Sequence, residues 1–166
     1  MEQQKLSSTF DYYINKVEAN DVGDLLQKNA TKIIEIASNL DSIKWQYSYE
    51  NDKWSIGQLL YHLLDTERIM CYRALTFARG EQIELPGYNH ESYAKEIDLS
   101  FSKADLFVQE YELLRRGTIL MFQGFTTQQL DRIAHFSNQK IAVGQLQRLI
   151  AGHESHHLEI LCKRYL

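Results

Sequence analysis

The chain has 166 residues, the usual size of one domain and enough to bury a core. Its 22 acidic and 18 basic residues give a net charge of −4, and no cluster of lysine and arginine suggests nucleic-acid binding. The two cysteines form no CxxC pair, and neither a signal peptide nor a long uncharged apolar segment is evident. We therefore expect a single cytoplasmic domain, residues 1–166, that binds neither nucleic acid nor membranes.

One proline and only eight glycines favour an all-α chain over a sheet protein with many turns. Residues 1–20 carry several aromatic side chains among polar ones, and we predict an irregular segment that packs these aromatics against a helix. A first helix is predicted from about Asp21, because apolar residues then recur at helical spacing. These residues are Leu26, Ala30, Ile33, Ala37 and Leu40.

Residues 42–53 are predicted to form a loop that carries aromatic side chains. Ser55 and Gln58 have the spacing of a capping box, so a second helix should begin there and end near Gly80. Its apolar stripe consists of Leu59, Leu63, Thr66, Met70, Ala74 and Phe77. We place Trp54, just before this helix, in the core.

Residues 81–100 contain the turn signal Pro86-Gly87 and are predicted to form a crossover with a short helix near residues 89–97. A third long helix should follow Ser100 or Ser102 and end near Gly124. After a turn, the last helix should begin at about Val143. Four long amphipathic helices with long connections predict a four-helix bundle, whose core is a common location for metals.

The last helix carries two histidines on its apolar stripe, His153 and His157. Residues four apart lie on the same face of a helix, so the two imidazoles should be side by side. This is the spacing of a metal-binding pair. A catalytic metal site typically uses three protein ligands, and the third is expected from a facing helix.

His62 is the best candidate for the third ligand, because it flanks the apolar stripe of the second helix. His90 and His135 lie in connections, where the geometry of a ligand is harder to hold. His156 is rotated by about 60° from the first histidine of the pair and should point elsewhere. The predicted metal ligands are His62, His153 and His157.

Several charged residues are candidates for supporting roles. Each ligating imidazole should donate its second N–H to an acceptor, and Asp65, Glu67, Glu154 and backbone carbonyls are all candidates. Glu67 suits a buried partner of an arginine better than a general base. Arg73 follows His62 by eleven residues on nearly the same helix face, so it could bind a substrate carboxylate or serve the structure alone.

Two segments resemble the signature of the DinB/YfiT-like four-helix bundle superfamily. Residues 53–68 read KWSIGQLLYHLLDTER, similar to the family pattern KWS-I-G-E-x-x-x-H-L-x-D-x-E-R. Residues 151–158 read AGHESHHL, similar to the family segment A-G-H-x-x-H-H. Residues 72–74 and 85–88 look like landmarks between the two, so the resemblance covers nearly the whole chain from the first predicted helix onward.

The resemblance implies a divalent metal, commonly nickel or zinc, held by one histidine of the second helix and two of the last. These positions correspond to His62, His153 and His157. Members with known chemistry use thiols, as in bacillithiol S-transferases and mycothiol-dependent maleylpyruvate isomerases. A small-molecule substrate is therefore expected, with a low-molecular-weight thiol as a candidate.

A divalent ion on three neutral imidazoles can lower the pKa of a bound thiol or water. We therefore predict a metal-dependent enzyme, in the first place a thiol S-transferase, with a hydrolase as the nearest variant. The alternative is a stress-related metal-binding or structural protein that catalyses nothing. An open metal position beside a pocket would favour the enzyme, whereas a glutamate or His90 as fourth ligand would favour the alternative. We also predict a homodimer, with the aromatic residues among positions 1–20 at its interface.

Overall fold

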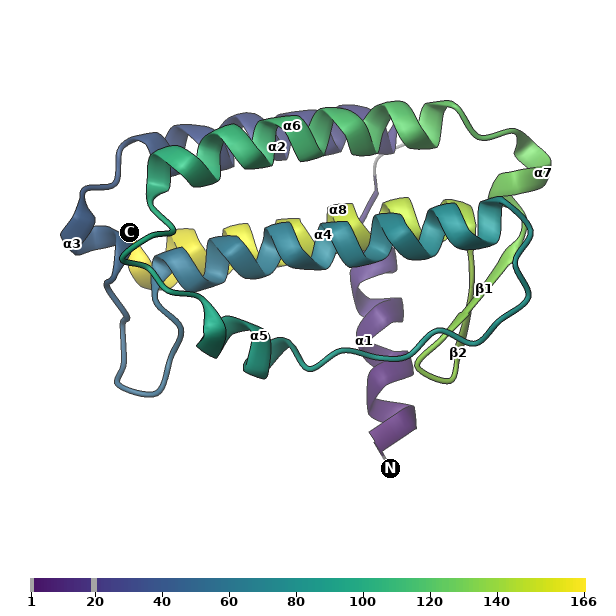
Figure 1. Ribbon diagram of the computed structural model, residues 1–166, viewed down its shortest axis with the longest axis horizontal. Helices are drawn as coiled ribbons and strands as arrows, with labels where there is room; N and C mark the ends of the chain where they lie inside the picture. The colour runs from purple at the N-terminus through teal and green to yellow at the C-terminus, as the bar shows by residue number, and fades with distance from the viewer. Residues whose placement is uncertain (1, 19–20) are drawn as a thin grey trace.

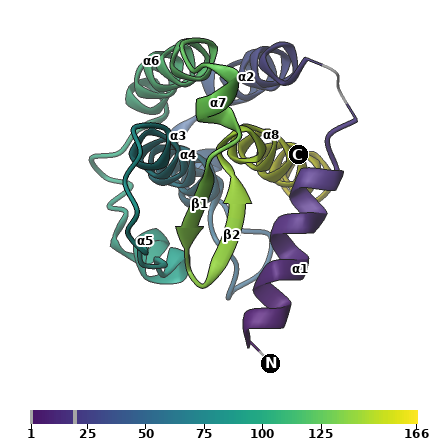
Figure 2. The same cartoon turned by 90° about the vertical axis from the view of Figure 1, so that its right-hand side faces the viewer.

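The computed structural model describes residues 2–18 and 21–166, and four long helices lie side by side in it. Figure 2 shows them in two layers, with α2 and α6 in one and α4 and α8 in the other. Their bounds are α2 (Val22–Ser38), α4 (Ile56–Ala78), α6 (Ala104–Gln123) and α8 (Val143–Ile160), and α8 continues into the π-helical turn η1 (Leu161–Tyr165). The predicted all-α four-helix bundle is confirmed.

The ends of the long helices are set by local capping. The Asp21 side chain accepts a hydrogen bond from the Asp24 backbone N–H at the start of α2. Ser55 and Gln58 form the predicted capping box at the start of α4, each side chain bonded to the other's backbone N–H. Gly80 follows α4 with φ +98°, a conformation that suits glycine at a helix end.

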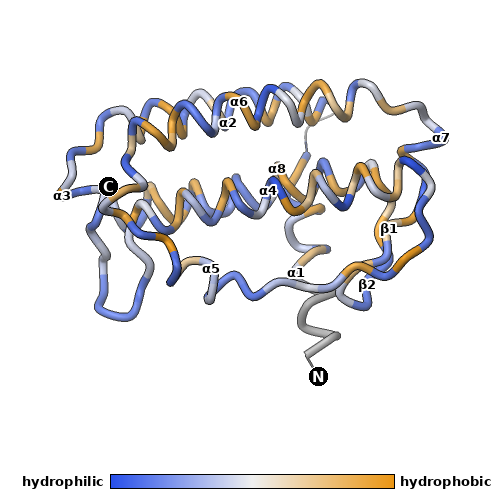
Figure 3. The backbone as a smooth tube through the Cα atoms, in the orientation of Figure 1, coloured by the Kyte–Doolittle hydropathy of each residue, from blue (hydrophilic) through white to orange (hydrophobic). Residues whose placement is uncertain are grey.

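The apolar stripes of the long helices turn inward, and Figure 3 shows apolar and polar residues alternating along each of them. Phe77, Leu146 and Phe136 belong to one buried cluster, whereas Trp45, Leu60 and Phe107 belong to a second one. Within the described part of the chain, no helix combines the length and apolarity that crossing a bilayer requires. The two clusters contain most of the apolar side chains of the long helices.

The N-terminal segment differs from the prediction of an irregular chain. It forms helix α1 (Glu2–Asn15), which crosses α8 on the side away from α2 and α6 (Figures 1 and 2). Phe10, Tyr13, Ile14 and Val17 pack against the first core cluster. Their spacing of three, four and seven residues is that of one helical face, which the prediction overlooked. Residues 1, 19 and 20 lie outside the described part.

The connections hold further short elements. The segment predicted as a loop contains α3 (Ser42–Trp45), and the crossover contains the expected short helix, α5 (His90–Glu96). The predicted turn before α8 is longer than expected: α7 (Thr127–Leu130) is followed by a two-stranded antiparallel hairpin, β1 (Ile133–Phe136) and β2 (Gln139–Ala142). Four-residue strands with little alternation give a weak sequence signal.

The hairpin closes one end of the bundle. Ser137 and Asn138 form its two-residue turn, with φ of 51° and 59°, which matches the twist of antiparallel strands. The crossover lies against it, because the Leu85 N–H donates to the His135 carbonyl at 2.9 Å and the Ser137 N–H to the Leu85 carbonyl at 3.1 Å. The crossover, the hairpin and α1 therefore surround the same side of the α4–α8 layer.

Candidate metal centre

Three histidines meet between α4 and α8, and we call them the histidine cluster: His62, His153 and His157. The Nε2 atoms of His62 and His153 lie 3.0 Å apart, and the His153 and His157 ring centres are 4.5 Å apart. One ligand nitrogen of each residue lies within 4.8 Å of the others. The structure therefore brings together the three imidazoles that the sequence predicted.

The three histidines lie close together because α4 and α8 run in opposite directions. His62 lies in the first third of α4, whereas His153 and His157 lie in the second half of α8. Since α4 and α8 lie side by side and run in opposite directions (Figure 1), the beginning of one faces the end of the other. The spacing of four residues in α8 then points both of its imidazoles at His62.

Burial keeps the histidine cluster neutral. It lowers the pKa of His62 to about 4, and His153 and His157 have pKa values well below the usual range because of burial and the neighbouring imidazoles. Neutral imidazole is the form that binds a metal. The buried Nδ1 of His157 has no hydrogen-bond partner among the described residues, which is costly unless a ligand satisfies it. The cluster therefore fits a divalent ion.

A cavity of about 810 Å³ lies directly against the histidine cluster, and all three imidazoles line it. Its walls come from α1, α4, α8, the crossover and the hairpin turn; they include Phe10, Met70, Arg73, Tyr88, Asn138 and Ile150. This volume is typical of a small-molecule site. Among the described residues, no fourth histidine, cysteine or carboxylate joins the group. A structural metal site usually has four protein ligands, so this one resembles an open site.

Trp54 is half-buried: it packs against the second core cluster from outside and lines the cavity, so the prediction of a core position is only partly correct. Its ring centre is 4.7 Å from that of His62, and its indole N–H donates to Glu91 at 3.0 Å. The Tyr165 hydroxyl donates to the Trp54 carbonyl at 2.7 Å, so the turn after α8 fixes this residue. Trp54 therefore covers His62 on the crossover side.

Helix α1 forms the opposite wall, which the sequence analysis did not anticipate. The Tyr13 ring meets the His153 ring edge-on at 5.1 Å between centres. Gly152 permits this approach, because a Cβ at that position would lie 1.8 Å from the Tyr13 carbonyl oxygen. The helical spacing of Phe10, Tyr13 and Ile14, together with a glycine next to a predicted ligand, was the available signal.

The other histidines lie outside the cluster. His90 lines the cavity with its ring centre 5.8 Å from that of His62, but it is not among the three grouped ligands. His135 lies on β1, with its ring 6.2 Å from that of Phe77. His156 points away as predicted, and its Nδ1 lies 3.4 Å from the Tyr12 hydroxyl.

The predicted carboxylate acceptors lie elsewhere. Asp65 is 3.8 Å from Arg68 near the surface, whereas Glu67 and Glu154 are both buried against Arg115. No hydrogen bond between described residues joins these three carboxylates to the histidine cluster. Glu67 is thus the buried partner of an arginine, one of the two roles considered for it.

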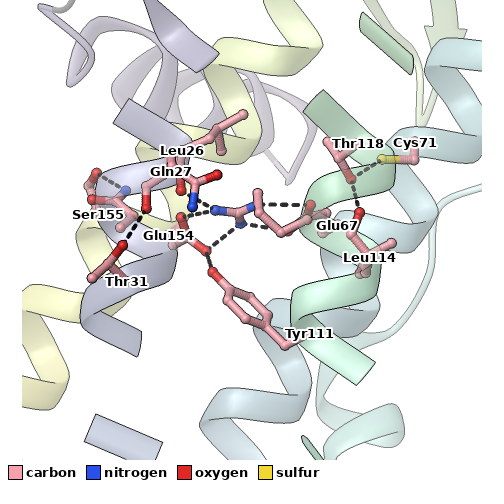
Figure 4. A network of polar contacts seen from close by, with 12 residues as sticks. Leu26, Gln27, Thr31, Glu67, Cys71, Tyr111, Leu114, Thr118, Glu154 and Ser155 are labelled. Carbon is pink, nitrogen blue, oxygen red and sulfur yellow. Dashed lines mark hydrogen bonds and ion pairs between the residues drawn. The ribbon is translucent and has the colours of Figure 1, made fainter. Parts of the chain in front are cut away.

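Arg115, Glu67, Glu154 and Tyr111 form a second buried group, the arginine cluster. The Arg115 Nη2 donates to Glu67 at 2.6 Å and to Glu154 at 2.5 Å, and its Nη1 donates to the Leu26 carbonyl at 2.6 Å. The Tyr111 hydroxyl donates to Glu154, and Figure 4 shows the Tyr111 side chain pointing at Glu154. The cluster joins α2, α4, α6 and α8. Sequence analysis did not single out Arg115, which occupies a buried position of α6.

Arg73 is buried at the cavity wall, and only 3% of it is exposed. Its Nη2 donates to the Pro86 carbonyl at 2.9 Å, and the guanidinium carbon lies 4.2 Å from the centre of the Phe136 ring. Nearby, the Thr66 and Tyr88 hydroxyls share a hydrogen bond of 2.5 Å. The crossover is thereby tied to α4 along the cavity.

The chain is similar in sequence and in structure to several known proteins. The chain is 24% identical over 147 residues to the "Putative metal-dependent hydrolase" of Oceanobacillus iheyensis, covering 86% of this chain and 84% of that protein. Among solved structures, it is similar to YfiT from Bacillus subtilis, described as a probable metal-dependent hydrolase with an unusual four-helix bundle topology. The TM-score is 0.75 at 16% identity, over 89% of each chain.

A DinB-like protein of Bacillus subtilis, YjoA, is also similar, with a TM-score of 0.59 at 17% identity over 86% of this chain and 88% of that one. Residues 25–161 match the DinB superfamily, a span that holds α4, α8 and the whole histidine cluster but not α1. Both the sequence match and the bundle topology agree with the resemblance seen in the two histidine segments. The chain belongs to the DinB superfamily.

Proposed function

We propose that this protein is a metal-dependent enzyme, most simply a hydrolase of a small molecule, in which His62, His153 and His157 hold a divalent ion such as Ni²⁺ or Zn²⁺. One observation carries the proposal: three neutral imidazoles, two of them buried and that of His157 half-buried, line a cavity of about 810 Å³ and supply three ligand nitrogens. The names of the Oceanobacillus protein and of YfiT support the same reaction class.

A divalent ion held there would lower the pKa of water or a thiol and polarise a carbonyl. The chain's own residues prepare the site for it. Burial keeps the imidazoles unprotonated, and Trp54 and Tyr13 cover His62 and His153 from two sides, which limits water. A low-polarity site of this kind strengthens electrostatic interactions with a substrate.

A thiol in place of water would make the protein an S-transferase. The resemblance of the two histidine segments to thiol-using members of the family supports this second candidate. Both candidates require the same metal ligands, so the metal is tested first and the nucleophile afterwards.

The first experiment measures metal content by mass spectrometry on protein purified without an affinity tag. We expect about one equivalent of nickel or zinc in the wild type and less than about a tenth in the double variant His153→Ala, His157→Ala, as a site with three ligands requires. His135→Ala is the matched control, since His135 lies outside the cluster. Equal metal content in the double variant would refute the ligand assignment.

The second experiment compares hydrolysis of ester and amide substrates with conjugation of low-molecular-weight thiols to an electrophile, before and after metal removal. Activity in the first assay that returns with added metal supports the hydrolase, and activity confined to the second supports the S-transferase. If metal binds stoichiometrically and neither assay responds, the non-catalytic alternative is favoured.

A further inference from the structure

A cation without a carboxylate partner faces the cavity. Arg73 is 3% exposed, and no aspartate or glutamate of the described residues forms an ion pair with it. Burial lowers the pKa of Arg73 to about 10, and the neighbouring Tyr88 offsets only part of this shift. Arginine is rarely buried without a partner, because desolvation of the charge costs several kcal/mol. Within the described part of the chain, no acidic side chain therefore balances the buried charge of Arg73.

Hydrogen bonding leaves Arg73 with capacity to spare. A guanidinium carries five N–H donors in a planar fork. The hydrogen bonds between described residues use two of them, one to the Pro86 carbonyl at 2.9 Å and one to the Met70 sulfur at 3.6 Å. Both contacts, and the Phe136 ring beneath it, fix the guanidinium in place at the cavity wall. A fixed fork of this kind matches the two oxygens of a carboxylate.

The histidine cluster and Arg73 line the same cavity at two different points along α4. His62, Thr66, Met70 and Arg73 all line the cavity and follow one face of α4 at helical spacing. Eleven residues separate His62 from Arg73, about 16 Å along the helix axis, although the guanidinium reaches back toward Met70. The cavity lining also includes apolar side chains of α1 and α8, namely Phe10, Leu149 and Ile150.

We propose that the cavity binds an elongated ligand with a carboxylate at Arg73, an apolar middle and its reacting group at the histidine cluster. The carboxylate end rests on Arg73 alone, whereas the reacting end rests on the proposed function. The ligand class is thus a medium-chain carboxylic acid carrying a hydrolysable group or an electrophile at its far end. A compact or cationic molecule would leave the Arg73 charge unpaired.

The test measures binding of three probes that share one alkyl chain: octanoate, octanol and octylammonium. Isothermal titration calorimetry is performed at neutral pH on metal-free protein, so that the carboxylate has no metal to bind. We expect octanoate to bind at least about tenfold more tightly than octanol, and octylammonium more weakly than either, because a hydrogen-bonded charge pair is being gained. Equal affinity for octanoate and octanol would overturn the proposal.

Variants then locate the carboxylate. Arg73→Gln should weaken octanoate binding about tenfold to a hundredfold and leave octanol within about twofold. Arg68→Gln is the matched control, since it removes an exposed arginine of the same helix. Arg73→Lys keeps the charge without the fork and should retain a preference for octanoate over octanol. This second variant preserves the test if Arg73→Gln fails to fold.

The two proposals fail in different ways. If the double variant His153→Ala, His157→Ala binds no metal but still prefers octanoate through Arg73, the carboxylate site stands. If wild-type protein takes up no metal, the proposed function fails while the probe series can still succeed. If octanoate binding depends on the histidines and ignores Arg73→Gln, the carboxylate site is refuted and the metal site is not.

Discussion

His153 and Glu154 are neighbours in α8, yet they point into two buried polar clusters that differ in one respect. In the arginine cluster every charge has a partner: Arg115 contacts both carboxylates, and Tyr111 donates to Glu154. In the histidine cluster the Nδ1 of His157 has no partner among the described residues, and the three imidazoles face a cavity. The arginine cluster is thus satisfied by the chain's own groups, whereas the histidine cluster leaves a buried nitrogen unpaired among the described residues.

The difference indicates what each cluster contributes. A satisfied network that joins α2, α4, α6 and α8 holds the bundle in one arrangement, and its loss should appear as lost stability. An unsatisfied group in a native structure points to a ligand, and its loss should appear as lost binding. The same distinction separates Arg115 from Arg73, because Arg115 pairs with two carboxylates and Arg73 forms no ion pair with any acidic residue that the structure describes.

Among single substitutions, the largest effect is expected from Arg115→Met, which removes the cation of the arginine cluster. Methionine fills similar space, but Glu67 and Glu154 would remain buried without a cation. We expect the free energy of unfolding to fall by about 3–5 kcal/mol, measured by denaturation in urea. The neighbouring Arg116→Met is the control, because Arg116 is exposed and its loss should change stability by about 0.5 kcal/mol or less.

An outcome with equal small losses for both arginine variants would mean that the arginine cluster adds nothing to the bundle. Replacing Arg115, Glu67 and Glu154 together by apolar residues provides a further check. This triple variant should recover much of the stability, since the damage comes from uncompensated charge and not from missing volume.

A pH titration of the metal-free protein should also change its stability strongly, this time through the histidine cluster. The folded pKa of His62 is lowered to about 4, and those of His153 and His157 lie well below the usual value near 6.5. Between the folded and unfolded pKa values, the unfolded chain binds more protons. Stability should therefore fall as pH drops below about 6.5, by up to about 1.4 kcal/mol per pH unit for each histidine.

The double variant His153→Ala, His157→Ala should show a shallower loss of stability between about pH 6.5 and 4.5, because two of the three titrating groups are gone. Denaturation in urea at several pH values measures the slopes. Glu154 remains in both proteins; burial raises its pKa, so its contribution has the opposite sign. Parallel curves for the two proteins would show that folding does not lower the pKa values of His153 and His157.

The long helices and the histidine cluster could be predicted from the sequence, whereas the arginine cluster could not. The long helices and the Ser55 cap follow from periodicity and local hydrogen bonding, which need only neighbouring residues. The three histidines were recognised because two of them repeat at helical spacing and the third flanks an apolar stripe on another helix. These signals are local, and the bundle topology then brings them together.

The arginine cluster and the walls of the cavity were harder to predict. Glu67 and Glu154 gave no sign that they share Arg115, because their pairing depends on how three helices are rotated against one another. Trp54 was assigned to the core since an aromatic residue beside a helix usually packs there. The crossover supplies its partner, Glu91, and a connection of this length has no pattern that fixes its path.

The smallest effect sharpens the comparison from the cavity side, through Gly152→Ala. A Cβ there would lie 1.8 Å from the Tyr13 carbonyl oxygen and 2.7 Å from the Tyr13 carbonyl carbon. The α1 backbone must therefore move. We expect a loss of about 1–3 kcal/mol on urea denaturation and faster proteolytic cleavage within residues 2–18. Metal content should stay near that of the wild type, because the ligands lie on α4 and α8.

Gly117→Ala supplies the control for the helical propensity of alanine. Gly117 lies inside α6, and a Cβ there meets nothing within 4 Å, so this change should stabilise the protein by up to about 1 kcal/mol. The two substitutions share the same gain in propensity and differ only in what the new methyl group meets. If Gly152→Ala also stabilised the protein without exposing α1 to protease, α1 could not be packed against α8 as a wall of the cavity. Opposite signs would show that α1 packs against α8 at Gly152 and closes the histidine cluster on this side.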